Sequence, residues 1–338
     1  MPNMTRIERV NAALKGEEVD LVPMSFWRHF YLQERDPGLL ADSLLAFQRE
    51  YGWDYMKVNP RASYHVEDWG NQYRWSDDPN ERPSLASHVV HSKDDWAKIG
   101  VLDIWRATAL KQQLVLLELI KEGLQNEEVY FLQTIFSPLE IAFRLAGHST
   151  ETLPRAMKEE SVEFQGALDA ITETFATYAR ASIDAGAGGI FYAVTRIAAG
   201  GAMTEEQYAR FGKPYDLRIL EAVKDRPGFN ALHICGAGIL FDRLKDYPVD
   251  ALSWDACSPS NPSLKKGRER SGKMVIGGID QKKTLVDGTP EQVAAEVRNA
   301  IAETGGRGIM LAPGCTYRPG TKKELLQAAL AARERESE

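Results

Sequence analysis

The sequence contains little cysteine, only three residues among 338. A small, odd number of cysteines in a long chain is not a disulfide framework, and it suits the reducing cytosol. The chain also lacks any apolar run of the roughly 18 residues that a membrane-spanning helix needs. Residues 1–16 have the pattern of a short amphipathic helix rather than that of a signal peptide. We therefore expect a cytoplasmic protein with no membrane span.

An excess of positive charge is missing as well. The chain has 41 Lys and Arg residues against 48 Asp and Glu residues, which is a formal net charge of −7. A protein that binds nucleic acids through their phosphates needs a basic face that displaces counterions, so we expect no nucleic-acid partner. With 43% hydrophobic residues, the chain is instead long and apolar enough to bury one large core.

Short apolar segments alternate with longer helical patterns along the chain. Eight of these segments are bounded by Gly, Pro, Asp or Asn and are typical of buried parallel strands. The expected strands are residues 21–27, 54–60, 129–136, 188–195, 229–235, 250–255, 273–279 and 308–313. The clearest helical segments are residues 204–226, 289–304 and 321–335. Eight strand–helix units predict an α/β fold, a single-domain (β/α)8 TIM barrel over residues 1–338.

A doubly wound parallel sheet is the competing fold. It would place a G-x-G-x-x-G turn after the first strand, but Ser25–His29 reads SFWRH. The polar stretch 65–98, which contains three tryptophans, follows the second expected strand and is longer than an ordinary loop. We interpret it as an insertion near the barrel mouth, either a lid or wall over a site or a plain surface excursion.

Three residues with metal-ligand chemistry fall at the ends of expected strands. His233 and Cys235 close the fifth segment, and residues two apart on a strand point to the same face. Cys315 follows the eighth segment, and TIM barrels keep their active sites at the carboxyl ends of strands. One imidazole and two thiolates suit zinc, and three protein ligands leave one position open, as in catalytic sites. Cys257 follows the sixth segment and could be a spare ligand, but two thiolates and the histidine already complete a three-ligand site. Ordinary burial is the alternative for all four residues.

Three further stretches, in this order and spacing, are characteristic of one protein superfamily. They are Thr5–Val10 (TRIERV), Gly186–Phe191 (GAGGIF) and Gly277–Gln281 (GGIDQ). With them the chain resembles the uroporphyrinogen decarboxylase superfamily over nearly its whole length. That superfamily contains the haem-pathway decarboxylase and a group of zinc methyltransferases that pass a methyl group between a corrinoid and a thiol, such as the methylcobamide:coenzyme M enzymes. The His-x-Cys…Cys zinc motif of these methyltransferases maps onto the three candidate ligands.

The resemblance is weaker toward the decarboxylases. They usually have two arginines after the first strand, whereas here Arg28 is present and Leu32 stands in the second position. They carry an aspartate after the second strand, whereas Val58–Arg61 (VNPR) contains no acid. Their late histidine loop is replaced by Pro313–Cys315. The resemblance therefore implies methyl transfer, with decarboxylation as the alternative.

The resemblance also implies a mechanism and a partner. Zinc would take a thiol at its open position and remove the thiol's proton, and the thiolate would attack a methyl group on cobalt. A corrinoid-binding module usually presents D-x-H-x-x-G; here His233–Gly236 supplies H-x-x-G, but Ala231 replaces the aspartate. We therefore expect the corrinoid to come on a separate corrinoid protein, or as free cobamide, and to dock over the barrel mouth. The small-molecule partner would be a thiol or a methylated substrate.

Six polar residues at or near strand ends are candidates for holding an anionic or polar substrate. They are Arg28, Lys57, Asn59, Tyr192, Arg196 and Asp255. Each could instead be a structural pair or a solvated rim residue. Two other functions stay open besides decarboxylation. The cysteines could bind metal for stability or storage, which four protein ligands would favour, or the site could methylate homocysteine, as zinc-dependent methionine synthases do.

Overall fold

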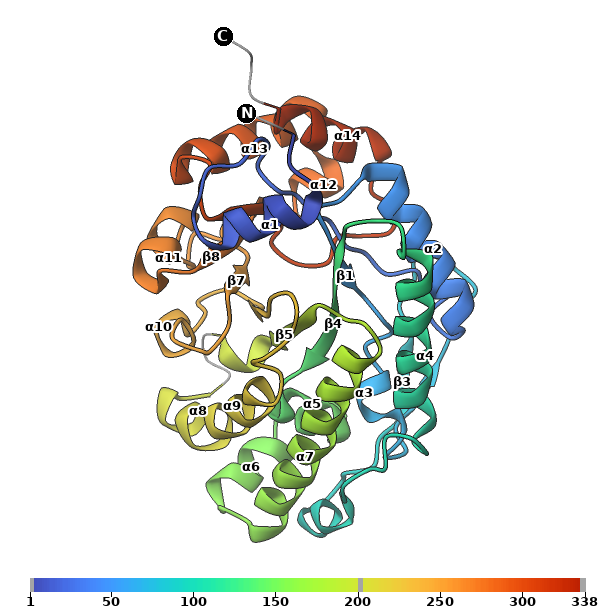
Figure 1. The fold of residues 1–338 in the computed structure, drawn as a ribbon. Coiled ribbons are helices and arrows are strands. Elements are labelled where there is room, and N and C mark those ends of the chain that lie inside the picture. Colours follow the sequence, from blue (N-terminus) through green and yellow to red (C-terminus); the bar gives the residue numbers. More distant parts are fainter. Residues whose placement is uncertain (1–2, 200–202, 335–338) are drawn as a thin grey trace.

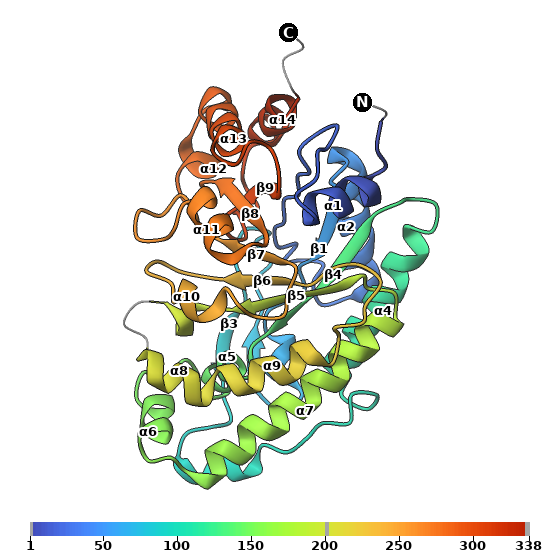
Figure 2. The same ribbon diagram turned by 60° about the vertical axis from the view of Figure 1, so that its left-hand side comes forward.

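Seven parallel strands form one curled sheet with helices on its outside (Figure 1, Figure 2). The structure, a computed structural model, describes residues 3–199 and 203–334, and of Arg196 only the backbone. The order along the sheet is β1-β4-β5-β6-β7-β8-β9. The strands are β1 (Tyr55–Val58), β4 (Tyr130–Phe136), β5 (Gly189–Val194), β6 (Ala231–Ile234), β7 (Ala251–Trp254), β8 (Met274–Ile279) and β9 (Ile309–Pro313). Each agrees with an expected strand to within a few residues.

The helices surround the sheet, and the long α7 lies beside α9 in both views. The longer helices are α1 (Arg6–Leu14), α2 (Pro37–Tyr51), α4 (Thr108–Gly123), α5 (Pro138–Leu145), α7 (Val162–Asp184), α9 (Lys213–Glu221), α11 (Leu264–Ser271), α13 (Pro290–Thr304) and α14 (Lys323–Ala332). The shorter ones are α3 (Tyr64–Glu67), α6 (Thr152–Lys158), α8 (Glu205–Phe211), α10 (Phe241–Leu244), α12 (Thr284–Asp287) and the 3-10 helix η2 (Arg196–Ala198). Within the described ranges, no helix combines the length and apolarity that crossing a bilayer requires.

The first of the eight expected strands is not a regular strand. Residues 21–27 form only an isolated bridge to β9, in which Leu311 N donates to Pro23 O at 2.8 Å. On the other side, Asp54 N, just before β1, donates to Met24 O at 2.9 Å. Pro23 has no N–H to donate, so a continuous ladder is interrupted there. The prediction of eight strands is therefore confirmed for seven, and the segment lies between the two edge strands β9 and β1.

Alternation along the strands divides the buried side chains into two groups. Phe191 and Met310 belong to a cluster inside the curled sheet, and Val10 of α1 joins this cluster. Tyr192 belongs to the larger cluster between the sheet and the helices. Because neighbouring residues of a strand point to opposite faces, a shift of one position decides whether a side chain can reach the interior.

Local signals set the ends of several helices. α13 begins after Thr289, whose side chain and backbone form a capping box, and ends at Gly305, which has a positive φ of 67°. α8 begins in the same way after Thr204. The helical segment expected over residues 204–226 is divided into α8 and α9 at Gly212, where the close approach of a tyrosine ring leaves no space for a Cβ.

The stretch 65–98 forms a small substructure of its own. It contains an antiparallel hairpin of β2 (Gln72–Arg74) and β3 (Ser84–Ser87), followed by the 3-10 helix η1 (Lys93–Lys98). Trp96 of η1 is fully buried and packs edge-on against Phe164 of α7, with the ring centroids 5.0 Å apart. Asn80, in the hairpin loop, borders a groove together with Pro319, which follows β9. The hairpin loop therefore lies next to the segment that follows β9.

Candidate metal centre and its cavity

His233 lies near the carboxyl end of β6, which is buried along its whole length. The imidazole is stacked against Phe191 with ring centroids 5.4 Å apart. Its Nδ1 lies 3.1 Å from the hydroxyl of Ser253, the residue beside it in register on β7. A hydroxyl that accepts the Nδ1 proton leaves Nε2 with a free lone pair. Ser253 therefore orients the histidine as a ligand through Nε2.

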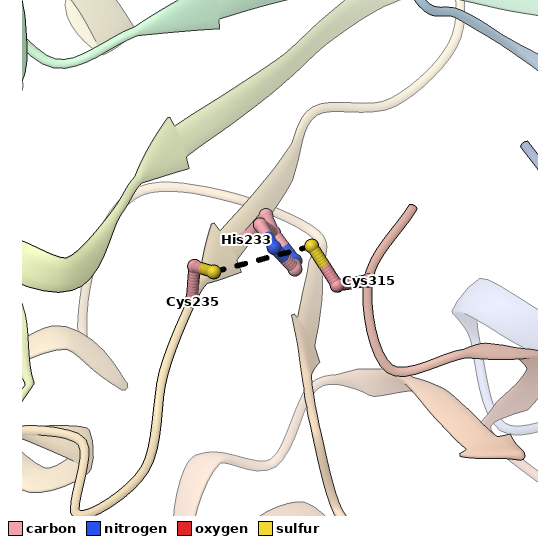
Figure 3. A group of neighbouring side chains, drawn as sticks. All are labelled: His233, Cys235 and Cys315. Carbon is pink, nitrogen blue, oxygen red and sulfur yellow. Dashed lines mark hydrogen bonds between the residues drawn. The ribbon is translucent and has the colours of Figure 1, made fainter. Parts of the chain in front are cut away.

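Cys235 and Cys315 approach His233 from two different strand ends (Figure 3). Cys235 directly follows β6, and its backbone N donates to Val194 O at 3.0 Å, which continues the strand direction. Cys315 follows β9 after Gly314, where a Cβ would lie 2.6 Å from the Cα of Asp255, the residue that follows β7. The two Sγ atoms are 3.9 Å apart, and the ligand atoms of all three residues lie within 4.8 Å of one another.

The donor set and its spacing fit a zinc ion. Zinc binds thiolates at about 2.3 Å in tetrahedral sites, which places two such sulfurs about 3.8 Å apart. The distance of 3.9 Å between the Sγ atoms of Cys235 and Cys315 matches this value. Among the described residues the group has three members, and Cys257, which is exposed, is not one of them. Three soft or borderline protein ligands are the arrangement of a catalytic zinc site.

The two sulfurs lie within hydrogen-bonding distance of each other. Their mutual hydrogen bond raises the pKa of Cys235 and lowers the pKa of Cys315, while burial opposes the ionisation of both. The nearby His233 lowers the pKa of Cys315 further. Burial makes a thiolate costly at this position, and a bound cation would offset its charge.

A cavity of about 120 Å³ opens in front of the three residues. The candidate ligands line it together with the apolar side chains of Trp27, Phe136 and Phe191. Lys57, Asn59 and His29 line it as well. This volume suits a small molecule, and an apolar pocket with a few placed polar groups is typical of a ligand site.

Lys57 is a buried lysine at the end of β1, with 5% of its surface exposed. Its ammonium donates to Asn59 Oδ1 and lies 4.8 Å from the centre of the Phe191 ring. Burial lowers the pKa of Lys57 to about 7, although the nearby Cys315 and Glu34 act to raise it. The amide Nδ2 of Asn59 is buried without a hydrogen-bond partner among the described residues. Both side chains therefore retain donors for a ligand.

The other predicted substrate residues lie elsewhere. Arg28 donates through Nη1 to Pro319 O at 2.7 Å and stacks over Phe30, in the groove outside the cavity. Tyr192 points toward the helices, the opposite side of β5 from Phe191, so it does not line the cavity. Asp255 is buried behind Gly314 and paired with Lys282 at 2.8 Å. The Arg196 side chain lies outside what the structure describes. Of the five candidates whose side chains the structure describes, only Lys57 and Asn59 line the cavity.

Sequence reasoning missed residues that the structure places at the site. The sequence analysis did not select Ser253, because a single serine in an apolar strand does not form a recognisable motif. The one available signal is that Ser253 is the polar residue of the strand Ala251–Trp254. His29 and His65 both line the cavity. His29 lies two residues after the expected strand 21–27, a position that could have found it as it found Arg28, whereas His65 is five residues beyond an expected strand and had no such signal.

Comparison with known proteins gives a match along the whole chain. The family described as "Uroporphyrinogen decarboxylase (URO-D)" matches residues 5–335. The methylcobamide:CoM methyltransferase MtaA of Methanosarcina barkeri is 24% identical over 355 aligned positions, which cover 99% of this chain and 99% of that protein. A uroporphyrinogen decarboxylase of Synechococcus sp. (strain CC9605) is 29% identical over 163 positions, which cover 46% of this chain and 43% of that protein.

A solved structure agrees with this match at the level of the fold. A methyltransferase from Methanosarcina mazei superposes with a TM-score of 0.79 at 24% identity, over 98% of this chain and 99% of that one. At such identity the likeness shows the fold alone, a curled parallel sheet surrounded by helices. The match to the family over residues 5–335 includes every element of the candidate site. The chain belongs to the uroporphyrinogen decarboxylase (URO-D) family, whose relatives matched here are methyltransferases and decarboxylases.

Proposed function

We propose that this chain is a zinc-dependent methyltransferase that moves a methyl group between a corrinoid and a thiol. The observation that carries the proposal is the convergence of His233, Cys235 and Cys315 at one side of a small cavity, with the spacing of zinc ligands. The full-length similarity to a methylcobamide:CoM methyltransferase supports the same reaction class.

Different residues of the site have different roles in the proposed reaction. When bound, zinc supplies a Lewis acid that ionises a thiol at neutral pH. The two cysteine thiolates offset the charge of the metal, and Ser253 holds His233 in the tautomer that offers Nε2. Lys57 and Asn59 line the same cavity and have free donors, with which they hold an anionic or polar part of the acceptor. The apolar walls keep water away from the nucleophilic sulfur.

The size of the cavity separates the two substrates in space. About 120 Å³ holds a small thiol but not a corrin macrocycle. The methyl donor therefore approaches from outside, carried by a corrinoid protein or as free cobamide, because Ala231 replaces the aspartate of a corrinoid motif. We also propose that the fold is a (β/α)8 barrel in which residues 21–28 take the place of the first strand, and that the reducing cytosol keeps both thiols available.

Decarboxylation of a porphyrinogen is the second candidate, favoured by the similarity of part of the chain to uroporphyrinogen decarboxylases. Three observations count against it. Leu32 stands where a second arginine would bind substrate carboxylates, and Asn59, not an acid, follows β1. The cavity is also far smaller than a tetrapyrrole. The methyltransferase is therefore the function that we propose.

Demethylation of methylcobalamin tests the proposal directly. Zinc-loaded protein is mixed with methylcobalamin, or a methylated corrinoid protein, and a panel of thiols that includes coenzyme M and homocysteine, and the visible spectrum is followed. We expect activity with at least one thiol and its loss in Cys235→Ala. Cys257→Ala is the matched control, since Cys257 is exposed and outside the ligand group. Failure with every thiol and every corrinoid would contradict the proposed function and leave a non-thiol acceptor such as a folate as the leading alternative.

A further inference from the structure

His29 and Glu34 form a hydrogen-bonded pair at the rim of the cavity. His29 Nδ1 lies 2.6 Å from Glu34 Oε1, and only 1% of the Glu34 side chain is exposed. The other carboxylate oxygen, Oε2, is buried without a hydrogen-bond partner among the described residues. The imidazole stacks on Tyr31 with ring centroids 4.9 Å apart. The pair is thus an imidazole oriented by a buried carboxylate, and the proposed zinc site makes no use of it.

The imidazole of His29 borders two spaces. One is the cavity lined by Cys235 and Cys315, and the other is the groove outside it, lined by Arg28 and Pro319. Because Nδ1–H is donated to the carboxylate, Nε2 keeps its lone pair. Within residues 3–199 and 203–334, Nε2 of His29 has no hydrogen-bond partner. His29 therefore lines the cavity and has one ring nitrogen free to accept a proton.

His65, the other histidine of the cavity apart from His233, cannot do the same. Its Nδ1 lies 3.0 Å from Ala62 O, and its Nε2 accepts a hydrogen bond from Phe136 N at 3.0 Å. Both nitrogens are committed to the backbone, and burial lowers the pKa of His65 well below its ordinary value. His65 is thus a structural residue that links α3 to the end of β4, whereas His29 has a nitrogen without a partner.

We propose that His29 is the general base that removes the proton of the acceptor thiol, with Glu34 as the residue that positions it. In this step the S–H bond breaks and its electron pair stays on sulfur, while the proton forms a new N–H bond at His29 Nε2. The imidazolium that results is paired with the Glu34 carboxylate. This inference rests on the proposed function, since it names the base that the thiol chemistry at the same site requires.

Charged and titratable groups face the pair from other elements. Lys57 on β1 is close enough for Glu34 to act on its pKa, and the two candidate cysteine ligands line the same cavity. Tyr31, stacked on the imidazole, has its pKa raised to about 12 by burial and by Glu34, with Arg82 of the hairpin loop acting in the opposite direction. These side chains are the titratable groups that surround the His29–Glu34 pair.

Proton stoichiometry tests the inference without methyl transfer. Zinc-loaded protein is titrated with the anionic thiol mercaptoethanesulfonate by calorimetry near neutral pH, in two buffers of different ionisation enthalpy. The free thiol, with a pKa of about 8.5, arrives protonated. We expect His29→Gln to release about one proton per thiol bound, and the wild type clearly less, because His29 retains the proton. Equal release by wild type and variant would overturn the inference while leaving the proposed function intact.

Chemical rescue provides a second readout that a merely structural role would not move. We expect His29→Ala to lose about 100-fold in kcat with a corrinoid methyl donor, and added imidazole to restore part of it. His91→Gln, which changes an exposed histidine before η1, is the matched control and stays at the wild-type rate. Full activity of folded His29→Ala, or no rescue by imidazole, would overturn the inference. A wild-type protein that binds no thiol would overturn the inference and the proposed function together.

Discussion

The Sγ atoms of Cys235 and Cys315 lie 3.9 Å apart, although the two residues are 80 positions apart in the sequence. Their strands β6 and β9 are separated in the sheet by β7 and β8. Three steps of about 4.8 Å across a flat sheet would separate the strand ends by roughly 14 Å. The curl of the sheet therefore brings the sulfurs together, and the candidate metal site depends on the tertiary fold.

Zinc content is the first prediction. We expect about one zinc per chain in the purified protein, as for a three-ligand catalytic site, and substoichiometric zinc in Cys315→Ala, because two protein ligands hold the ion far less tightly than three. Elemental analysis of both proteins measures this. Cys257→Ala should keep the wild-type zinc content, since that thiol is not in the ligand group. Zinc at full occupancy in Cys315→Ala would rule out the three-ligand arrangement.

Ser253→Ala should weaken zinc binding by about 10-fold or more, because loss of an outer hydrogen bond to a histidine ligand typically costs that much affinity. Ser253 is fully buried, and its hydroxyl is 3.1 Å from Nδ1 of His233. Competition with a chromophoric chelator gives the affinity. Ser253→Thr keeps the hydroxyl and is the matched comparison. Unchanged affinity in folded Ser253→Ala would mean that the hydroxyl does not orient the ligand.

Lys57→Met should raise KM for an anionic thiol by about 10-fold or more with little change in kcat, since a hydrogen bond to a charged group is lost. Burial lowers the pKa of Lys57 to about 7, so the side chain is charged below that pH and neutral above it. The ratio of KM for anionic mercaptoethanesulfonate to KM for neutral mercaptoethanol should therefore rise as the pH increases through about 7. Lys323→Met changes an exposed lysine and is the control. A KM ratio that is the same in wild type and Lys57→Met would exclude the lysine from the substrate site.

Asp216 of α9 is a buried carboxylate that accepts hydrogen bonds from the hydroxyls of Tyr192, Tyr208 and Tyr247. Burial raises the pKa of Asp216 to about 6, and the three tyrosines hold it from rising further. Between the unfolded value near 3.9 and about 6, the folded protein binds more protons than the unfolded chain, so its stability decreases as the pH rises through this window. The carboxylate thus adds a pH dependence to the packing of β5 against the helices.

Asp216→Asn should remove that dependence. In the wild type a pKa difference of about two units corresponds to about 3 kcal/mol in the free energy of unfolding across the window. Urea unfolding of both proteins at several pH values gives the difference, in which contributions from other groups cancel. Asp216→Ala should be much less stable at every pH, since it leaves three buried hydroxyls without their acceptor. Parallel pH profiles for wild type and Asp216→Asn would contradict this account.

Uroporphyrinogen decarboxylation should be absent. The chain offers neither a second arginine at Leu32 nor an acid after β1, and its cavity is too small for the substrate. Anaerobic incubation with the porphyrinogen, followed by analysis for loss of carboxylates, is the measurement. Clear turnover would mean that these departures from the decarboxylase pattern carry less weight than we give them.

The sequence by itself determined which segments are strands and which residues can bind metal. Runs such as 129–136 and 188–195 are apolar and bounded by turn residues, and both signals are local, so seven of the eight expected strands are present. His233 and Cys235 face the same way because they are two positions apart on one chain segment. Capping residues such as Thr289 set helix starts for the same reason, since their hydrogen bonds reach only a few positions along the chain.

The tertiary structure decided which of these residues meet. The distance from Cys235 to Cys315 depends on sheet curvature, and the pairing of His233 with Ser253 depends on strand register. Tyr192 was a substrate candidate by position, yet alternation along β5 turns it toward Asp216 and the helices. Residues 21–27 have a strand-like composition and lie between the edge strands β9 and β1. Pro23 has no N–H with which to continue the backbone hydrogen bonds of a strand. Contacts of this kind join residues far apart in the sequence, so their geometry follows from the packing of the whole chain and not from any local pattern.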